Sequence, residues 1–563
     1  MQNFIKSHPE FCAVSLLTIL CLFFLCFGLD FYPIIDTQEA LFAAISKNIV
    51  VHEDYNILML NMQPFLEKPP LYFWIITQSI KWFNVFNELS IRMPNTIISF
   101  TFVFFMYYMG KTIVSRKFGL TSAIILLTSL AYMVFSHLAI LNVSFIFFVT
   151  VALYLNFYAS LKQETSKSKS FLWFLFYVFC GLACLTKGFL GIILPFTTII
   201  IYYFLLGKLK EIFKPLHLIP GLLVFLLITM PWYCEMYKIF GSLFIKNYFF
   251  VPAIKHFFNN IFYFGIIFIP AFLPWTIIFL GDIFTIIKKI ALRFKHNIEF
   301  KPITLDQKLN IFFILYFCLT FLSISIMQKS TYSVLLLIPS ASVLTAYLLC
   351  EKYVDEIFKI KIVSLSTYIL ATLFTVSTIS FSFFYMFLPL NIFAQVQQII
   401  NFLIIGANFL SILMLLKLKN KNLVSIMFTY ILSMFFILVF TVAHGFNMFY
   451  LSGENEIVKF SQYAKTKDSS LIVYNLPILP SILLEANDYV YFIDKPNSKK
   501  LENTFKNTKG KVCYVILKNK DIATTQKKLT KALYLVDKGE KYSIYSNILL
   551  PKKALTLTKF YNE

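Results

Sequence analysis

Charged residues are scarce in this chain. Of its 563 residues, 14% are Asp, Glu, Lys or Arg, whereas soluble globular proteins average nearer one quarter. This deficit excludes a soluble globular protein. The hydrophobic residues, 58% of the chain, gather in repeated runs of about twenty residues, the length that a helix needs to cross a hydrocarbon core of about 30 Å. The sequence therefore predicts a multi-span membrane protein whose spans are helices rather than barrel strands.

Other features are also missing. The nine cysteines are an odd number, and all except Cys513 fall in or beside apolar runs, so no disulfide framework is expected. The chain shows no internal repeat and no low-complexity segment. Acidic residues are few, which leaves a formal net charge of +22, but most basic residues up to residue 449 lie in short loops between apolar runs. The charge therefore indicates membrane topology and not nucleic-acid binding.

The apolar runs predict about thirteen spans. The first is too long for a cleaved signal peptide and has no small-residue cleavage pattern, so we expect it to be retained. A fourteenth candidate, Leu71 to Phe86, is shorter and is interrupted by polar residues. The runs lie near residues 11–30, 93–114, 118–136, 140–161, 169–186, 188–206, 217–236, 261–282, 307–327, 332–351, 360–388, 398–416 and 422–444.

Loop charges decide how the fourteenth candidate is read. If Leu71 to Phe86 does not cross, the basic loops all face the cytoplasm, as the positive-inside rule expects. If it crosses, every later loop changes side and the basic loops face outward, against that rule. We therefore predict an amphipathic helix lying in the outer interface. The cytoplasmic loops then carry Lys6; Arg116 and Lys117; Lys162, Lys167 and Lys169; Lys208, Lys210 and Lys214; Lys288, Lys289, Arg293 and Lys295; Lys352; and Lys417, Lys419 and Lys421.

The chain changes character from about residue 450. Short β-prone runs at 471–474, 489–493 and 512–517 alternate with helix-like stretches, which predicts a small α/β domain. Thirteen spans place this domain outside the cytoplasm. It has nineteen Lys and Arg against eleven Asp and Glu, which fits either contact with anionic lipid head groups or a solvated basic surface. We expect a transmembrane domain at 1–449, with outer loop and interfacial helices at 31–92, and a periplasmic domain at 450–563.

A polar segment follows the first span. It holds Asp36 to Glu39 and Glu67 to Pro70, and because charges at a membrane edge are costly to desolvate, they suggest a site. The predicted topology places ten unusual polar residues on the outer side or at outer span ends. They are Asp36, Glu39, Glu67, Lys68, Arg92, Asn142, Lys187, His256, Lys329 and Tyr332.

Each of these residues also has a structural interpretation. Arg92 and Lys187 are long enough to snorkel to the interface, and a single histidine such as His256 is more often structural than a ligand. Glu67 and Lys68 also fit a surface pair. The position of Lys187 favours function, because it lies between two apolar runs with almost no loop to hold a charge.

The chain resembles the bacterial lipid A aminoarabinose transferases, within the wider group of membrane glycosyltransferases that use polyprenyl-phosphate sugars and includes protein O-mannosyltransferases. The Glu-Lys-Pro and Thr-Lys-Gly elements are the more specific part of the resemblance. The residues that carry it run from 67 to 332: Glu67-Lys68-Pro69-Pro70-Leu71-Tyr72-Phe73-Trp74; Ile91-Arg92-Met93-Pro94; Gly181 to Pro195 around Thr186-Lys187-Gly188; Pro231-Trp232-Tyr233; Leu273-Pro274-Trp275; and Lys329-Ser330-Thr331-Tyr332.

The resemblance implies a GT-C-like fold and transfer of a sugar from undecaprenyl phosphate to lipid A at the periplasmic face of the bacterial inner membrane. Cations must stabilise the phosphate that leaves, and a carboxylate can accept the proton of the acceptor. The implied donor-phosphate ligands are Lys68, Arg92, Lys187 and Lys329. Asp36 and Glu39 are the alternatives for this catalytic carboxylate. Glu67, Asn142 and Tyr332 are the implied substrate-binding residues.

The chain departs from the family pattern in three places. The family has adjacent Asp and Glu in the first outer loop, where this chain has Gln38-Glu39, with Asp36 two residues earlier. A family Asp at the outer end of the fourth span is Asn142 here. A family Glu-His pair followed by Arg-Phe reads Lys255-His256-Phe257. These departures weigh against a bound divalent metal, so no cofactor is assigned, and Glu67 and His256 are only weak candidate ligands for such a metal.

Two alternatives remain. The same donor chemistry could serve a protein or another glycan acceptor. A transporter or flippase would instead place polar groups near the membrane midplane on broken helices and would show internal repeats. The polar groups of this chain fall at outer span ends, which favours the enzyme.

Overall fold

The computed structural model describes most of the chain in two compact units. The first unit comprises residues 1–29, 67–72 and 92–443, and the second comprises 30–66, 73–91 and 444–563. The described residues are 7–34, 38–163, 166–249, 257–295, 304–326, 330–350, 356–385, 405–416, 426–439, 454–465, 469–476, 480–485, 490–493, 495–507, 511–527, 529 and 533–548.

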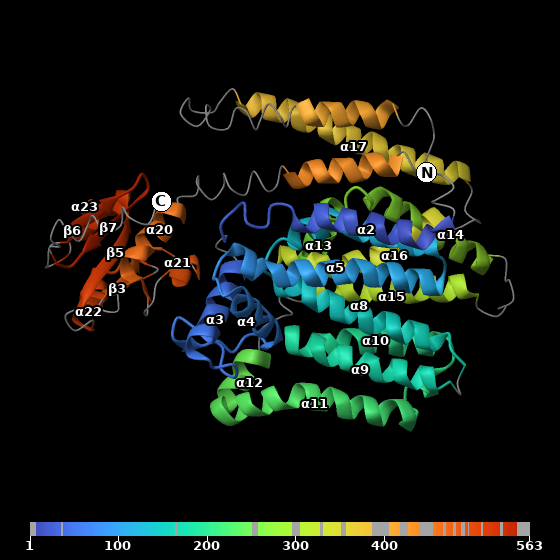
Figure 1. Cartoon of the computed structure of the whole chain (residues 1–563), viewed down its shortest axis with the longest axis horizontal. Coiled ribbons are helices and arrows are strands. Elements are labelled where there is room, and N and C mark those ends of the chain that lie inside the picture. The colour runs from blue at the N-terminus through green and yellow to red at the C-terminus, as the bar shows by residue number, and fades with distance from the viewer. Residues whose placement is uncertain are drawn as a thin grey trace. The chain divides into compact units, whose positions relative to one another are not determined.

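The first unit is built of apolar helices (Figure 1). Among the described residues, eight helices are long and apolar enough to span a membrane, or nine if a bent pair counts as one span. This confirms the predicted helical multi-span class, while the total of about thirteen stays a prediction. The elements are α2 (Pro9–Cys26), α5 (Glu88–Ile113), α6 (Arg116–Leu127), α7 (Leu130–Phe135), α8 (Leu141–Ser160), α9 (Lys167–Lys187), α10 (Leu190–Leu205), η1 (Leu209–Glu211), α11 (Pro215–Phe240), α12 (Ser242–Phe249), α13 (Phe257–Ala271), α14 (Thr276–Lys295), α15 (Leu305–Ile326), η3 (Thr331–Leu337), α16 (Ile338–Cys350) and α17 (Glu356–Tyr385), with shorter apolar helices at Ile405–Leu416 and Ile426–Val439.

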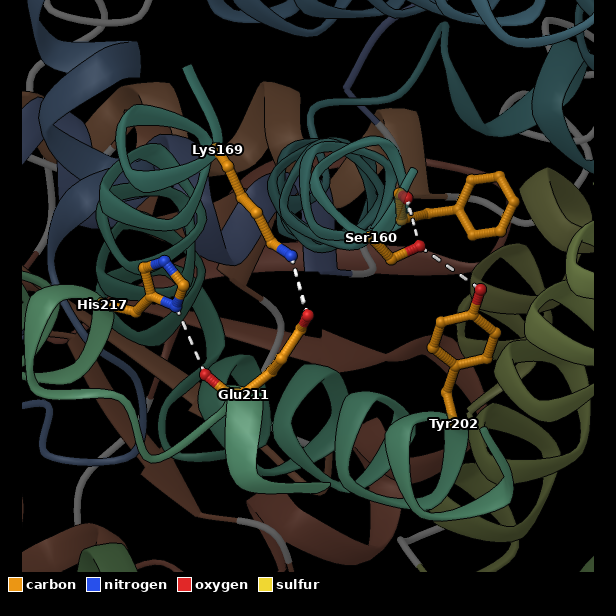
Figure 2. A network of polar contacts seen from close by, with 6 residues as sticks. Ser160, Lys169, Tyr202, Glu211 and His217 are labelled. Carbon is orange, nitrogen blue, oxygen red and sulfur yellow. Dashed lines mark hydrogen bonds and ion pairs between the residues drawn. The ribbon is translucent and has the colours of Figure 1, made fainter. Parts of the chain in front are cut away.

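Helices α8, α9 and α11 form a packed group in this unit, with α9 in contact with both of the others. Near the start of α9, a buried ion pair joins Lys169 to Glu211 of η1, with Nζ 2.9 Å from Oε1 and 3.0 Å from Oε2. The ring of His217 accompanies it, with Nδ1 3.2 Å from the backbone carbonyl oxygen of Glu211 (Figure 2). This pair ties the first turn of α9 to the connection between α10 and α11.

Two predicted spans are not single helices. The run at 261–282 consists of α13 and α14, bent by 119°, and the peptide bond between Leu273 and Pro274 in the bend is cis. The run at 118–136 is α6 and α7, separated at Thr128 and Ser129. The two interruptions meet, because the indole of Trp275 donates to the Thr128 hydroxyl at 3.0 Å and the amide of Leu130 donates to the carbonyl of Leu273 at 3.0 Å. Backbone groups freed by one break are thus satisfied at the other, as the membrane interior requires.

The second unit contains a five-stranded sheet, which confirms the predicted C-terminal α/β domain. The strand order is β4-β3-β5-β7-β6, with β4, β3 and β5 parallel and β7 and β6 antiparallel. Successive residues along β3, such as Leu471 and Ile472, enter separate hydrophobic clusters on opposite faces of the sheet. The elements are α20 (Glu454–Ser461), η4 (Gln462–Lys465), β3 (Ser469–Tyr474), α21 (Pro480–Glu485), β4 (Val490–Ile493), α22 (Ser498–Asn507), β5 (Val512–Lys518), η5 (Asn519–Asp521), α23 (Ile522–Gln526), β6 (Tyr534–Lys538) and β7 (Tyr542–Ser546).

The loop predicted to be the first outer loop lies in this same unit. It forms α3 (Gln38–His52), the hairpin β1 (Met59–Leu60) and β2 (Gln63–Pro64), and most of α4 (Leu71–Phe83). The side chain of Asn61, at the tip of the hairpin, both donates to and accepts from the backbone of Val490 at 2.9 Å. Helix α3 packs on α21, and the ammonium group of Lys47 donates to the Leu484 carbonyl. The helix predicted within 71–86 is confirmed as α4.

Candidate functional site

The C-terminal end of α9 presents Lys187 to the first turn of α8. Its ammonium group donates a hydrogen bond to Oδ1 of Asn142 at 3.1 Å and lies 5.4 Å from the ring centroid of Phe145. Helix α9 ends directly after Lys187, where Gly188 adopts a φ of +83°. The charge is therefore held at a helix end by a neutral amide and an aromatic face.

Lys68 is the second cation at this place. It lies in the segment between β2 and α4, is half-buried, and its ammonium group is close enough to that of Lys187 for the two charges to repel. Burial lowers the pKa of Lys68, and the charge of Glu67 opposes this shift. Within the part of the chain that the structure describes, neither lysine forms a salt bridge with a carboxylate. Two half-buried ammonium groups near each other create a positive potential suited to an anion.

Arg92 is fully buried in α5 and is directed to the end of the first span. Its Nη1 donates to the carbonyl oxygen of Leu29 at 2.6 Å. The buried ring of His137 lies against the same turn, with Nε2 3.1 Å from the carbonyl oxygen of Phe27. These contacts fasten the exit of the first helix. A phosphate-binding role for Arg92 stays a prediction.

The structure does not bring the remaining predicted site residues together with Lys187 in one described cluster. Tyr332, in η3, packs edge-on against Phe135, with ring centroids 5.1 Å apart. Glu67 is exposed, and Glu39 is buried in α3 of the second unit. Asp36, His256 and Lys329 lie outside the described residues.

The described residues do not assemble a metal site. No group of three or more His, Cys, Asp or Glu side chains comes together among them, and Glu67, one of the two candidate ligands, is exposed. The other candidate, His256, lies outside the described ranges.

Phe145 was not predicted as part of this site. It follows Asn142 by three residues, a spacing that places both side chains on one face of a helix. That spacing was the available signal. Nothing in the local sequence connects Lys68 with Lys187, which are far apart in the chain.

Together, the helical fold and the two lysines define a multi-span membrane protein with a cluster of half-buried cations. Comparison with known proteins specifies the class further. Residues 67–234, which include Lys68, Asn142 and Lys187, match the family model described as dolichyl-phosphate-mannose-protein mannosyltransferase. The crystal structure of ArnT from Cupriavidus metallidurans bound to undecaprenyl phosphate superposes with a TM-score of 0.75 over 95% of this chain and 98% of that one, at 16% identity. This shows a common fold.

Curated relatives match shorter segments. An uncharacterised protein of Aquifex aeolicus is 29% identical over 280 residues, which are 49% of this chain and 54% of that protein. The undecaprenyl phosphate-alpha-4-amino-4-deoxy-L-arabinose arabinosyl transferase of Wigglesworthia glossinidia brevipalpis is 25% identical over 194 residues, 34% of each chain. The chain thus spans between about a third and about half the length of these relatives. The predicted resemblance to the aminoarabinose transferase group is confirmed.

Proposed function

We propose that this protein is a glycosyltransferase that moves a sugar from an undecaprenyl-phosphate carrier to lipid A at the periplasmic face of the bacterial inner membrane. The observation that carries the proposal is the pair of half-buried ammonium groups of Lys68 and Lys187, which repel each other and have no salt bridge with a carboxylate among the described residues. A lipid-linked phosphate between them would relieve that repulsion.

The reaction assigns a role to each charge. An acceptor oxygen attacks the anomeric carbon of the sugar, a bond forms between them, and the bond from that carbon to the phosphate oxygen breaks. Undecaprenyl phosphate leaves with the electron pair, so its negative charge grows in the transition state, where Lys68 and Lys187 stabilise it. The proton of the acceptor passes to a carboxylate, for which Asp36 and Glu39 are the alternatives.

The acceptor is the second part of the proposal. The motif resemblance to lipid A aminoarabinose transferases favours lipid A, and similarity to undecaprenyl phosphate-aminoarabinose arabinosyl transferases supports the donor. A protein acceptor is the second candidate, because the matching family model is described as a protein mannosyltransferase. Both candidates share the donor and the leaving group, so the lysine pair serves either reaction.

Mass spectrometry tests the proposal. Lipid A and membrane glycoproteins are compared between cells with the gene, cells without it and cells carrying Lys187→Ala. We expect a sugar on lipid A only with the intact gene, and a loss of roughly 100-fold in the variant, as for removal of one oxyanion donor. A sugar found on protein instead would favour the second candidate. No change in either pool, together with altered uptake of a solute, would indicate a transporter and reject the enzyme.

A further inference from the structure

The turn that follows Lys187 has little conformational freedom. Gly188 has φ +83° and ψ −161°, a region of backbone conformation that is essentially open only to glycine. Its amide donates to the carbonyl oxygen of Cys184 at 2.8 Å, which closes the last turn of α9. The direction in which Lys187 leaves the helix therefore depends on how this turn is held.

Tyr248 of α12 closes over the same turn. A Cβ atom on Gly188 would lie 2.5 Å from the Tyr248 hydroxyl, so only glycine permits this approach. The Tyr248 hydroxyl is 2.7 Å from that of Tyr233 in α11, and the Tyr233 hydroxyl donates to the Cys184 carbonyl at 3.5 Å. The two hydroxyl groups thus connect α12 and α11 to the end of α9.

Aromatic packing fixes the hydroxyl pair in place. The ring of Tyr248 lies 5.2 Å from that of Phe244 and 5.6 Å from that of Tyr233, and Phe189 lies 5.3 Å from Tyr233, between ring centroids. Such offset and edge-on pairs add stability beyond the area they bury. Burial also raises the pKa of Tyr248, so its hydroxyl remains neutral and able to donate.

We propose that Tyr248 is a positioning residue of the phosphate site: with Tyr233, it fixes the turn at Gly188 and thereby aims the ammonium group of Lys187 at the donor phosphate. This inference rests on the proposed function of Lys187. The Tyr248 hydroxyl lies against the turn at Gly188, so in this proposal it acts through Lys187. The alternative is a purely structural role, in which Tyr248 and Tyr233 only pack α12 against α11.

A double-mutant cycle separates these roles. The probe is undecaprenyl phosphate itself, titrated into the purified full-length protein in lipid nanodiscs. We expect Tyr248→Phe to weaken its affinity about fivefold, the effect of losing one hydrogen bond, and Lys187→Ala to weaken it at least tenfold. Tyr248→Phe should have no further effect in the Lys187→Ala background. Tyr237→Phe is the matched control, because that tyrosine of α11 is 55% exposed.

Each outcome decides a different statement. If Lys187→Ala leaves the affinity unchanged, the phosphate site of the proposed function is wrong. If Lys187→Ala weakens binding but Tyr248→Phe behaves like Tyr237→Phe, the inference is overturned. It is also overturned if the losses of affinity from Tyr248→Phe and Lys187→Ala multiply in the double variant, because Tyr248 then does not act through Lys187. Tyr233→Phe is a second variant of the same hydroxyl pair, and it should likewise have no further effect in the Lys187→Ala background. The unfolding temperature of each variant shows whether it folds.

Discussion

Asn142 is a neutral partner for Lys187, and this preserves the positive charge of the site. An aspartate at that position would form an ion pair with the ammonium group, whereas the carboxamide oxygen accepts its hydrogen bond without cancelling its charge. The carboxamide therefore leaves the positive charge of this place uncancelled, which the proposed phosphate site requires.

Lys68 gives the site a dependence on pH. Burial lowers its pKa, so its charge, and with it the affinity for undecaprenyl phosphate, should fall as pH rises through that lowered value, at a lower pH than for an ordinary lysine. In Lys68→Arg the guanidinium stays charged up to about pH 12, so the fall in affinity should move to higher pH. Binding is measured from about pH 6 to pH 10.

Lys81 supplies the control for that titration. It is an exposed lysine of α4 whose pKa is raised, mainly by its hydrogen bond with Tyr55. Lys81→Arg should leave the binding curve unchanged. Identical curves for Lys68→Arg and the unaltered protein would show that Lys68 does not govern binding in this range.

At the scale of helices and strands, the sequence predicted where apolar helical segments lie better than whether each segment is one unbroken helix. Hydropathy sums over about twenty residues, so it detected the apolar content of 261–282 but not the bend at Leu273-Pro274. Hydropathy also missed the break at Thr128. A contact with Trp275, far along the chain, accompanies this break, and a local hydropathy window does not detect such a contact. The lysine pair was predicted residue by residue through family resemblance, but the meeting of Lys68 with Lys187 depends on tertiary packing that no local pattern encodes.

The ion pair at the start of α9 should stabilise the packing of α9, α10 and α11. The Lys169 and Glu211 side chains are only 2% and 5% exposed, so Lys169→Met leaves a buried carboxylate without its partner, at a cost of about 3–5 kcal/mol. We expect a clear fall in the unfolding temperature in detergent. Because the double variant Lys169→Met/Glu211→Leu leaves no buried charge unpaired, it should regain most of the loss.

An exposed pair in the same unit is the matched control. Lys111 and Glu10 are 2.7 Å apart, with side chains 37% and 41% exposed. Lys111→Met should cost less than about 1 kcal/mol, since solvent screens such pairs. Equal losses for Lys169→Met and Lys111→Met would mean that the buried pair adds nothing beyond surface charge.

At the scale of the whole molecule, the first outer loop and the C-terminal domain form one unit although more than 400 residues separate Asn61 from Val490 in the chain. The Asn61 side chain pairs with the backbone of an edge strand as a neighbouring strand would. Asn61→Ala should weaken this attachment by about 1–3 kcal/mol. Hydrogen exchange at Val490 should then accelerate, whereas Gln63→Ala, an exposed side chain of the same hairpin, should leave it unchanged. Unaltered exchange in Asn61→Ala would show that the hairpin does not protect the strand.

The topology of the whole chain depends on α4. Its thirteen residues span about 20 Å at 1.5 Å per residue, too short to cross a core of about 30 Å, and Trp82 near its end is 79% exposed, as suits an interfacial helix. In a cysteine-free background, a membrane-impermeant maleimide should therefore label Lys81→Cys and Lys499→Cys from the periplasmic side of intact spheroplasts. Lys208→Cys, on a predicted cytoplasmic loop, should react only after permeabilisation. If Lys81→Cys and Lys499→Cys also require permeabilisation, the predicted orientation of the outer loop and the C-terminal domain is reversed, and the lysine pair would face the wrong side for a periplasmic acceptor.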